Sequence, residues 1–377
     1  MRNLGLDIVR SLAIFLVMLA HGMMFFLLPF YPVSNSLIFF AVLGVEIFFV
    51  LSGFLIGQIL LNDVLVEQNW PALRRFYLRR WFRTLPLYFL ILIIVCLIND
   101  KFFWQHLFFV QNFNTESLNF FPVSWSLTVE EWFYLLIPFF LLLLFRISKK
   151  NRNSVNKFFY LLVLIIISLI LLRLFYVFLF NPIWDEEVRR QFYVRLDSLG
   201  IGVLIAGIKV YKKAFYEKIT KYPWILYSLS IIGFYTLYKL IPWNQPEVLN
   251  NSFFYRTFLL NFFSILSGLI IIAFESDTFI NNIKSKIIVK TFTFISVTSY
   301  SVYLIHYEIY NYYSRKIATI TETMGIWLTS TVITIIAAFI LYRFFELPIM
   351  NLRDKMGWSR THNAKSQTTS NSARQYS

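Results

Sequence analysis

The side chains with the clearest chemical potential are ionisable groups placed inside long apolar runs. In the first run, Arg10 and His21 are separated by residues 11–20, so they share one face of a helix with 3.6 residues per turn. Asp7, three residues before Arg10, joins that face. His21 then lies about 16 Å along the axis from Arg10, at 1.5 Å per residue. An imidazole at this depth suits a proton-transfer or nucleophilic role, and the alternative is a satisfied helix-packing residue.

A second basic group precedes a later apolar run. Arg80 and Arg83 are three residues apart on one helical face, an arrangement in which two planar guanidinium groups can bind phosphate oxygens. Arginines at this end of a membrane span also act simply as topology signals or lipid contacts. The spacing alone leaves these two readings equal.

Acidic, basic and imidazole groups also occur towards the opposite ends of the runs. A lone carboxylate such as Glu46 must be paired or protonated in an apolar run. Ser52 and Gly53, a few residues later, are typical of a close helix-packing point. We expect six groups to lie at similar depth, opposite the arginine end: His21, Glu46, Glu130, Arg195, Asp197 and His306. Trp125 fits an interfacial aromatic belt at that level.

Composition excludes several other kinds of site. Cys96 is the single cysteine and lies in an apolar run, so we expect no disulfide, no thiolate metal site and no metal cofactor. The formal net charge of +15 would permit nucleic-acid binding, but the placement of the charges, described next, accounts for it without nucleic acid. We assign no role to His106 and His362.

The apolar runs themselves predict an all-α, polytopic integral membrane protein. The chain of 377 residues is 58% hydrophobic and 20% aromatic, with a mean hydropathy of +0.62. Runs of about 20 apolar residues match the bilayer core, and lipid forces the backbone to satisfy itself within helices. We predict ten spans, at 6–28, 37–61, 82–98, 126–145, 158–180, 196–211, 223–241, 254–274, 291–311 and 326–345.

Lysine and arginine alternate between the gaps in a way that predicts orientation. They concentrate in the even-numbered gaps and in the tail, and cytoplasmic loops carry this excess, so both termini are predicted to be cytoplasmic. Residues 1–28 contain Asp7 and Arg10 and lack a cleavage site, which favours a retained first span over a signal peptide. Residues 1–350 form one transmembrane domain, and residues 351–377 a polar tail predicted to be disordered.

These segments resemble the type-3 membrane acyltransferases, bacterial O-acyltransferases that modify surface polysaccharides and other glycans. The resemblance runs from Leu6 to Pro348 and is carried, in family order, by Leu6–Arg10 with His21, Gly44–Phe54, Arg80–Arg83, Trp125–Glu130 with Phe133 and Tyr134, Ser299–His306, and Glu346–Pro348. Departures are Ser11 in place of the usual glycine and Glu46 in place of a frequent aspartate. The chain has no room for the extracytoplasmic hydrolase-like domain of some members, so no second autonomous transfer step is expected.

The resemblance implies a reaction and a location. The donor is cytoplasmic acyl-CoA, most often acetyl-CoA, and the acceptor is a hydroxyl of an envelope glycan or lipid-linked saccharide at the bacterial cytoplasmic (inner) membrane. On this hypothesis Arg10, Arg80 and Arg83 hold the CoA phosphates, and His21 is the general base or a transient acyl carrier. Glu130 orients His21 or binds sugar hydroxyls, Asp7 positions Arg10, and the acceptor-site or supporting residues are Glu46, Ser52, Trp125, Arg195, Asp197 and His306. Arginines and His21 should line one protein-enclosed route.

Two other classes of function remain compatible with buried charges in many spans. A transporter or exporter of a sugar or glycan would also place polar groups at mid-depth, although no inverted repeat is detectable. A purely structural membrane subunit leaves those charges unexplained. An assay of acyl transfer from labelled acetyl-CoA to a glycan acceptor, compared with an assay of solute counterflow, separates the acyltransferase from the transporter.

Overall fold

The fold is a bundle of helices. A computed structural model describes residues 3–31, 34–113, 115–147, 154–317 and 319–355, and within these ranges the regular structure is helical. The helices are α1 (Leu4–Gly22), α2 (Ser34–Ile59), α3 (Leu65–Glu67), α4 (Trp70–Asn99), α5 (Thr115–Phe120), α6 (Ser124–Ile147), α7 (Ser154–Phe180), α8 (Leu196–Tyr211), α9 (Lys213–Ile219), α10 (Pro223–Leu240), α11 (Pro246–Asn251), α12 (Phe253–Ser276), α13 (Thr278–Asn281), α14 (Lys286–Ser314), α15 (Ile320–Leu341) and α16 (Leu347–Arg353).

Each of the ten predicted ranges falls on a helix, which confirms the all-α membrane fold. Within the described residues, eight helical segments are long and apolar enough to cross a bilayer. The two predicted spans outside that set are α8, which has 16 residues, and α10, which has 18. The total of ten spans and the cytoplasmic position of both termini stay predictions.

The third span begins much earlier than its apolar run predicts. The side chain of Asn69 accepts a hydrogen bond from the backbone amide of Ala72 at 2.8 Å, and Pro71 occupies the first turn, so α4 starts at Trp70 rather than at residue 82. The arginine-rich stretch is therefore helical. Arg80 stands 10 residues after Trp70, about 15 Å along α4, so it lies deeper in the bundle than predicted.

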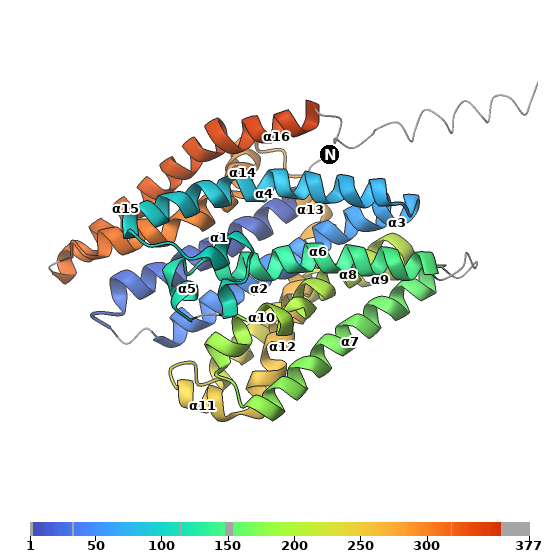
Figure 1. Ribbon diagram of the computed structural model, residues 1–377, viewed down its shortest axis with the longest axis horizontal. Coiled ribbons are helices and arrows are strands. Elements are labelled where there is room, and N and C mark those ends of the chain that lie inside the picture. The colour runs from blue at the N-terminus through green and yellow to red at the C-terminus, as the bar shows by residue number, and fades with distance from the viewer. Residues whose placement is uncertain (1–2, 32–33, 114, 148–153, 318, 356–377) are drawn as a thin grey trace, which may run out of the picture.

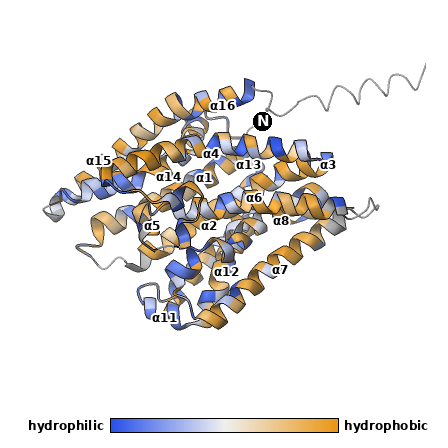
Figure 2. Ribbon diagram, viewed as in Figure 1, coloured by the Kyte–Doolittle hydropathy of each residue, from blue (hydrophilic) through white to orange (hydrophobic). Residues whose placement is uncertain are grey.

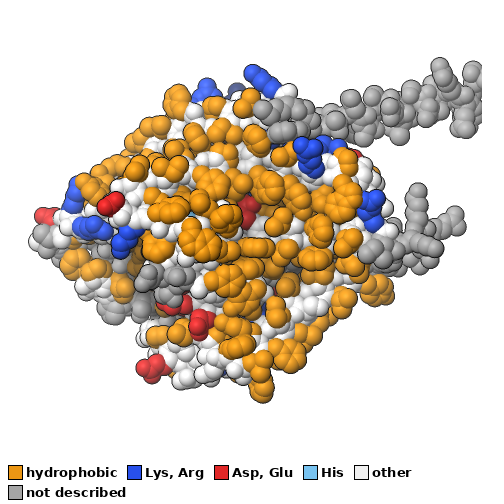
Figure 3. Space-filling model, in the orientation of Figure 1, with side chains coloured by type: hydrophobic (Ala, Val, Ile, Leu, Met, Phe, Trp, Pro, Cys, Tyr) orange, Lys and Arg blue, Asp and Glu red, His pale blue; other side chains and the backbone are white. Residues whose placement is uncertain are grey.

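The bundle has two ends and an apolar girdle. The N-terminus, α3, α9 and α13 lie at one end, whereas α5 and α11 lie at the other (Figure 1). Hydrophobic residues run along the helices between these ends, and hydrophilic residues gather at the ends (Figure 2). Hydrophobic side chains cover most of the face drawn in Figure 3. Such an exposed apolar surface suits a protein surrounded by lipid, and we treat the chain as multi-pass.

The far end of the chain continues beyond its predicted last span. A π-helical turn, Tyr342–Glu346, joins α15 to α16, so residues 351–353 are helical. The remainder of the predicted tail from residue 356, with His362, lies outside the described residues. His106, in the connection between α4 and α6, is fully buried, and burial lowers its pKa to about 4. This histidine is therefore a neutral packing residue at pH 7.

Glycines allow α2 and α8 to cross in direct backbone contact. A methyl group added to Gly202 would overlap the backbone oxygen of Val50, and one added to Gly53 would overlap that of Leu199. The predicted close-packing point at Gly53 is thus confirmed, and small residues are what such membrane crossings require.

Replacing Gly202 by alanine is expected to lower the free energy of unfolding by roughly 1–3 kcal/mol, because the two backbones must separate. Gly325→Ala on α15 is the matched control, since a methyl group there meets open space and alanine favours a helix by about 1 kcal/mol. Thermal unfolding of both variants in the same detergent measures the difference. Equal stability of the two variants would contradict the close crossing.

Candidate active site

Helices α1 and α14 run side by side, and side chains of α14 contact the residues predicted in the first span. Ser296 of α14 donates a hydrogen bond to Asp7 Oδ1 at 2.7 Å. The same hydroxyl accepts one from Arg10 Nη1 at 3.3 Å. Further along, His21 contacts His306, also on α14. The expectation that Asp7, Arg10 and His21 share a helical face is confirmed, and Ser296 is the bridge that sequence reasoning missed.

The two histidines form an imidazole pair at the end of this interface. His21 Nδ1 lies 2.8 Å from His306 Nε2, and the ring centroids are 5.0 Å apart. His306 is fully buried, and its Nδ1 lies 3.0 Å from the backbone oxygen of Val302. The ring of Tyr307 meets His21 edge-on at 5.3 Å. His306, predicted as an acceptor-site or supporting residue, is thus the direct partner of His21.

Arg80 is held against the start of α6. Its Nη2 donates to Tyr134 Oη at 2.6 Å and lies 3.2 Å from Glu130 Oε2, and its guanidinium carbon stands 4.1 Å from the centre of the Tyr134 ring. Tyr134 in turn donates to Glu130 Oε2 at 2.7 Å, and Ser52 is hydrogen-bonded to the Tyr134 hydroxyl. One guanidinium is therefore fixed by a carboxylate, a phenol and an aromatic face.

The position of Glu130 corrects the predicted division by depth. Sequence reasoning placed Glu130 with His21 and the arginines at the opposite face, whereas Glu130 is paired with Arg80. The reason is the early start of α4, which carries Arg80 inward to the level of Glu130. Among the described residues the hydrogen-bond partner of His21 is His306, so Glu130 is not what orients it. Tyr134 was quoted only as part of a motif, and its role required the fold.

A cavity of about 160 Å³ opens between α1, α2, α4, α6 and α14. Its polar wall consists of Arg10, Ser52, Arg80, Arg83, Thr84, Ser126, Glu130, Ser299, Tyr300 and Tyr303. Arg83 is exposed to this space and has no hydrogen-bond or ion-pair partner within the described parts of the chain. The three predicted donor-binding arginines therefore meet at one cavity, and Arg83 has the freest guanidinium.

The cavity ends short of the histidine pair. Tyr303 lines it and also packs against His306, with 5.9 Å between ring centroids. The Tyr303 hydroxyl donates to the backbone oxygen of Val123 at 3.1 Å and lies 2.5 Å from Ser126 Oγ. The expected continuous route from the arginines to His21 is thus interrupted by the Tyr303 side chain in this conformation.

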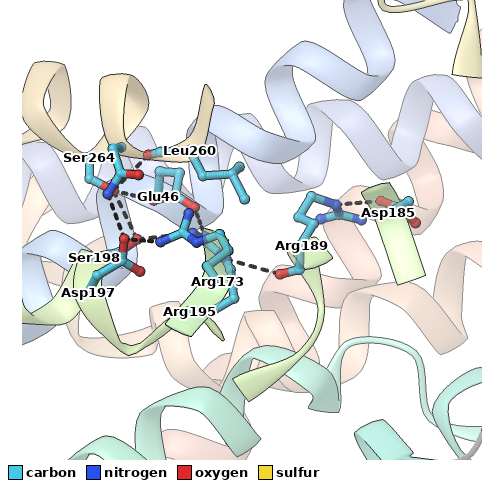
Figure 4. Close-up of polar contacts among 10 residues, drawn as sticks. Glu46, Arg173, Asp185, Arg189, Arg195, Asp197, Ser198, Leu260 and Ser264 are labelled. Carbon is cyan, nitrogen blue, oxygen red and sulfur yellow. Dashed lines mark hydrogen bonds and ion pairs between the residues drawn. The ribbon is translucent and has the colours of Figure 1, made fainter. Parts of the chain in front are cut away.

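Glu46, Arg195 and Asp197 belong to a separate buried network rather than to the cavity wall (Figure 4). Glu46 pairs with Arg195, and Ser264 of α12 donates to Glu46 Oε2 at 2.8 Å. Asp197 pairs with Arg173 of α7, and Asn261 donates to Asp197 Oδ2 at 2.6 Å. Both ion pairs are almost completely buried. They join α2, α7, α8 and α12, and none of the three predicted residues lines the cavity.

Arg173 was overlooked, although its signal was present in the sequence. It is the single arginine within the apolar run of α7, and an arginine at that depth requires a partner. Sequence reasoning noted the carboxylate of Asp197 without finding this cation. The distance along the chain, from residue 173 to residue 197, concealed the pair.

Trp125 packs against the connection between α7 and α8. The guanidinium carbon of Arg189 stands 5.0 Å from the centre of the Trp125 ring. Arg189 and Arg190 both pair with Asp185, at 2.5 Å each. Burial opposes ionisation of Asp185, but the two arginines outweigh it and hold its pKa below the ordinary value. Sequence reasoning assigned these arginines no role.

No cluster of three or more histidine, cysteine, aspartate or glutamate side chains suited to a metal ion occurs in the ranges that the structure describes. The polar side chains that line the cavity carry guanidinium, hydroxyl and carboxylate groups.

Comparison with known proteins relates the chain to acyltransferases. A family model described as "Acyltransferase domain" matches residues 3–343. The chain is 29% identical over 339 residues to the O-acetyltransferase OatA of Staphylococcus aureus strain NCTC 8325 / PS 47, covering 81% of this chain and 52% of the relative. It is 26% identical over 372 residues to a putative O-acetyltransferase of strain COL, covering 91% and 56%. The chain thus spans about half the length of the curated relatives it matches. No solved structure matches it.

Proposed function

The chain belongs to the type-3 membrane acyltransferase family, whose model matches residues 3–343, and we propose that it is an O-acetyltransferase. It moves an acetyl group from acetyl-CoA to a hydroxyl of a cell-envelope glycan or lipid-linked saccharide at the bacterial cytoplasmic membrane. The names of the relatives support the acetyl group and the oxygen acceptor. The observation that carries the proposal is a cavity walled by Arg10, Arg80 and Arg83 that ends one side chain short of the pair formed by half-buried His21 and buried His306.

The donor binds at the arginine end. Arg80 is already neutralised by Glu130, so Arg83, without such a partner among the described residues, is the guanidinium best able to bind phosphate oxygens. A cavity of about 160 Å³ is too small for all of coenzyme A. The phosphates therefore stay at the arginines, and the narrow pantetheine arm carries the thioester inward.

His21 acts on the acceptor hydroxyl. As the hydroxyl oxygen attacks the thioester carbonyl, His21 takes the hydroxyl proton, the new C–O bond forms and the C–S bond breaks. The proton then passes to the departing thiolate, which leaves as free coenzyme A. Tyr303 stands between the cavity and His306, so its side chain swings aside before the thioester reaches His21.

The donor site is tested through Arg83. Arg83→Met is expected to weaken binding of acetyl-CoA about 10- to 150-fold, because a hydrogen bond to a charged group contributes about 1.5–3 kcal/mol. Binding of labelled acetyl-CoA to the purified chain in lipid nanodiscs measures this, and the loss should be smaller for Arg83→Lys, which keeps the charge but not the planar fork.

Arg75→Met is the matched control, since Arg75 pairs with Glu67 at the surface and does not line the cavity. Unchanged binding by Arg83→Met, or an equal loss in Arg75→Met, would contradict the donor site. If the same purified chain, reconstituted into vesicles, showed solute counterflow but no acetyl transfer, the transporter would be favoured instead.

A further inference from the structure

A backbone oxygen determines which nitrogens of the histidine pair carry hydrogen. The carbonyl oxygen of Val302 can only accept a hydrogen bond, and it lies 3.0 Å from His306 Nδ1. Two lone pairs would repel at that distance, so His306 Nδ1 is the protonated nitrogen. Neighbouring rings hold this orientation: Tyr310 meets His306 edge-on at 6.1 Å, and Tyr303 lies at 5.9 Å.

His306 is neutral in this environment. Its side chain is fully buried, and no carboxylate is hydrogen-bonded to it in the part of the chain that the structure describes. A buried imidazolium without a counter-ion would carry a large desolvation cost. A neutral imidazole protonated at Nδ1 has a lone pair at Nε2, and His306 Nε2 is therefore an acceptor.

The hydrogen between the two rings must then come from His21. His21 Nδ1 lies 2.8 Å from His306 Nε2, so it donates, and the lone pair of neutral His21 is left on Nε2. Within the described residues this Nε2 has no hydrogen-bond partner. It is also not one of the side-chain atoms that are completely buried without a partner. The basic atom is thus the one that remains available to a substrate.

We propose that His306 is a positioning residue, which fixes His21 in the Nδ1-protonated form and so presents Nε2 as the base. It takes the place that a carboxylate holds in many hydrolytic sites, but as a neutral acceptor. When His21 Nε2 receives the hydroxyl proton, Nδ1 continues to donate to His306, so neither ring has to turn. This inference rests on the proposed function for its catalytic meaning, whereas the protonation pattern is a property of the chain itself.

The protonation pattern is measured directly by nitrogen NMR. The full chain, with its four histidines labelled with nitrogen-15, is placed in lipid bilayers at pH 7, and single replacements assign the signals. We expect His21 and His306 both to be protonated at Nδ1 and unprotonated at Nε2. In His306→Met, His21 should lose its preference for Nδ1. A wild-type His21 protonated at Nε2 would overturn the inference, whether or not the protein transfers acetyl groups.

Kinetics then separate positioning from packing. His306→Met fills a similar volume with a weak acceptor, whereas His306→Gln places a carbonyl oxygen near the former Nε2. With acetyl-CoA and envelope glycans from a strain lacking the gene, kcat should fall about 100-fold or more in His306→Met, with KM for acetyl-CoA unchanged. His306→Gln should recover at least ten-fold of that loss. If His306→Met and His306→Gln had equal kcat and equal thermal stability, the positioning role would be overturned. If the wild type transferred no acetyl group, the proposed function itself would be rejected.

Discussion

Replacing His21 by alanine is expected to abolish acetyl transfer while leaving the protein inserted and folded. Positioned general bases contribute about 10²- to 10⁴-fold to the rate. No other histidine among the described residues is placed to substitute for His21, because the side chains of His106 and His306 are fully buried. KM for acetyl-CoA should change little, because Arg10, Arg80 and Arg83 are untouched. Ester-linked acetate on envelope glycans, from a strain lacking the gene and complemented with each variant, measures the effect.

Phe15→Ala is the matched control on the same helix. Phe15 is 59% exposed on α1, so its truncation leaves both the imidazole pair and the cavity's polar wall intact. Membrane insertion and thermal stability of both variants are compared with the wild type, which separates loss of chemistry from loss of fold. Acetylation retained in an inserted His21→Ala protein would remove the central residue from the mechanism.

Replacing Glu46 by leucine is expected to destabilise the protein severely, by about 3–5 kcal/mol. The change leaves Arg195 fully buried without its carboxylate and leaves Ser264 without the acceptor at Glu46 Oε2. The double variant Glu46→Leu with Arg195→Leu should recover much of the stability, because removing both charges also removes the desolvation cost. Unfolding free energies in detergent give the coupling between the two sites.

The exposed pair between Lys213 and Glu217 supplies the contrast. These side chains are 80% and 64% exposed, so Glu217→Leu should change stability by less than about 0.5 kcal/mol. If Glu46→Leu is as mild as this control, the network does not hold α2 against α8. If instead the Glu46→Leu protein is stable but no longer transfers acetyl groups, Glu46 acts on a substrate rather than on the packing of α2 against α8.

The sequence by itself determined the helices and the faces of their charged groups. Apolar runs of bilayer length require helices because lipid offers the backbone no partners, and all ten predicted ranges are helical. Helical periodicity likewise predicted that Arg10 and His21 share a face, and both contact α14. Local rules of this kind depend on neighbours along one helix, so they can be read without knowing the fold.

Only the tertiary structure decided which groups meet. His21 and His306 are 285 positions apart, and Glu46 and Arg195 are 149 apart, and periodicity predicts a face but not the helix opposite it. The pairing of Arg80 with Glu130 was missed because hydropathy marks where a helix becomes apolar, not where it begins, and Asn69 starts α4 well before its apolar part. Partners are chosen by how helices pack, since a buried charge is stable only where another helix brings it a counter-ion.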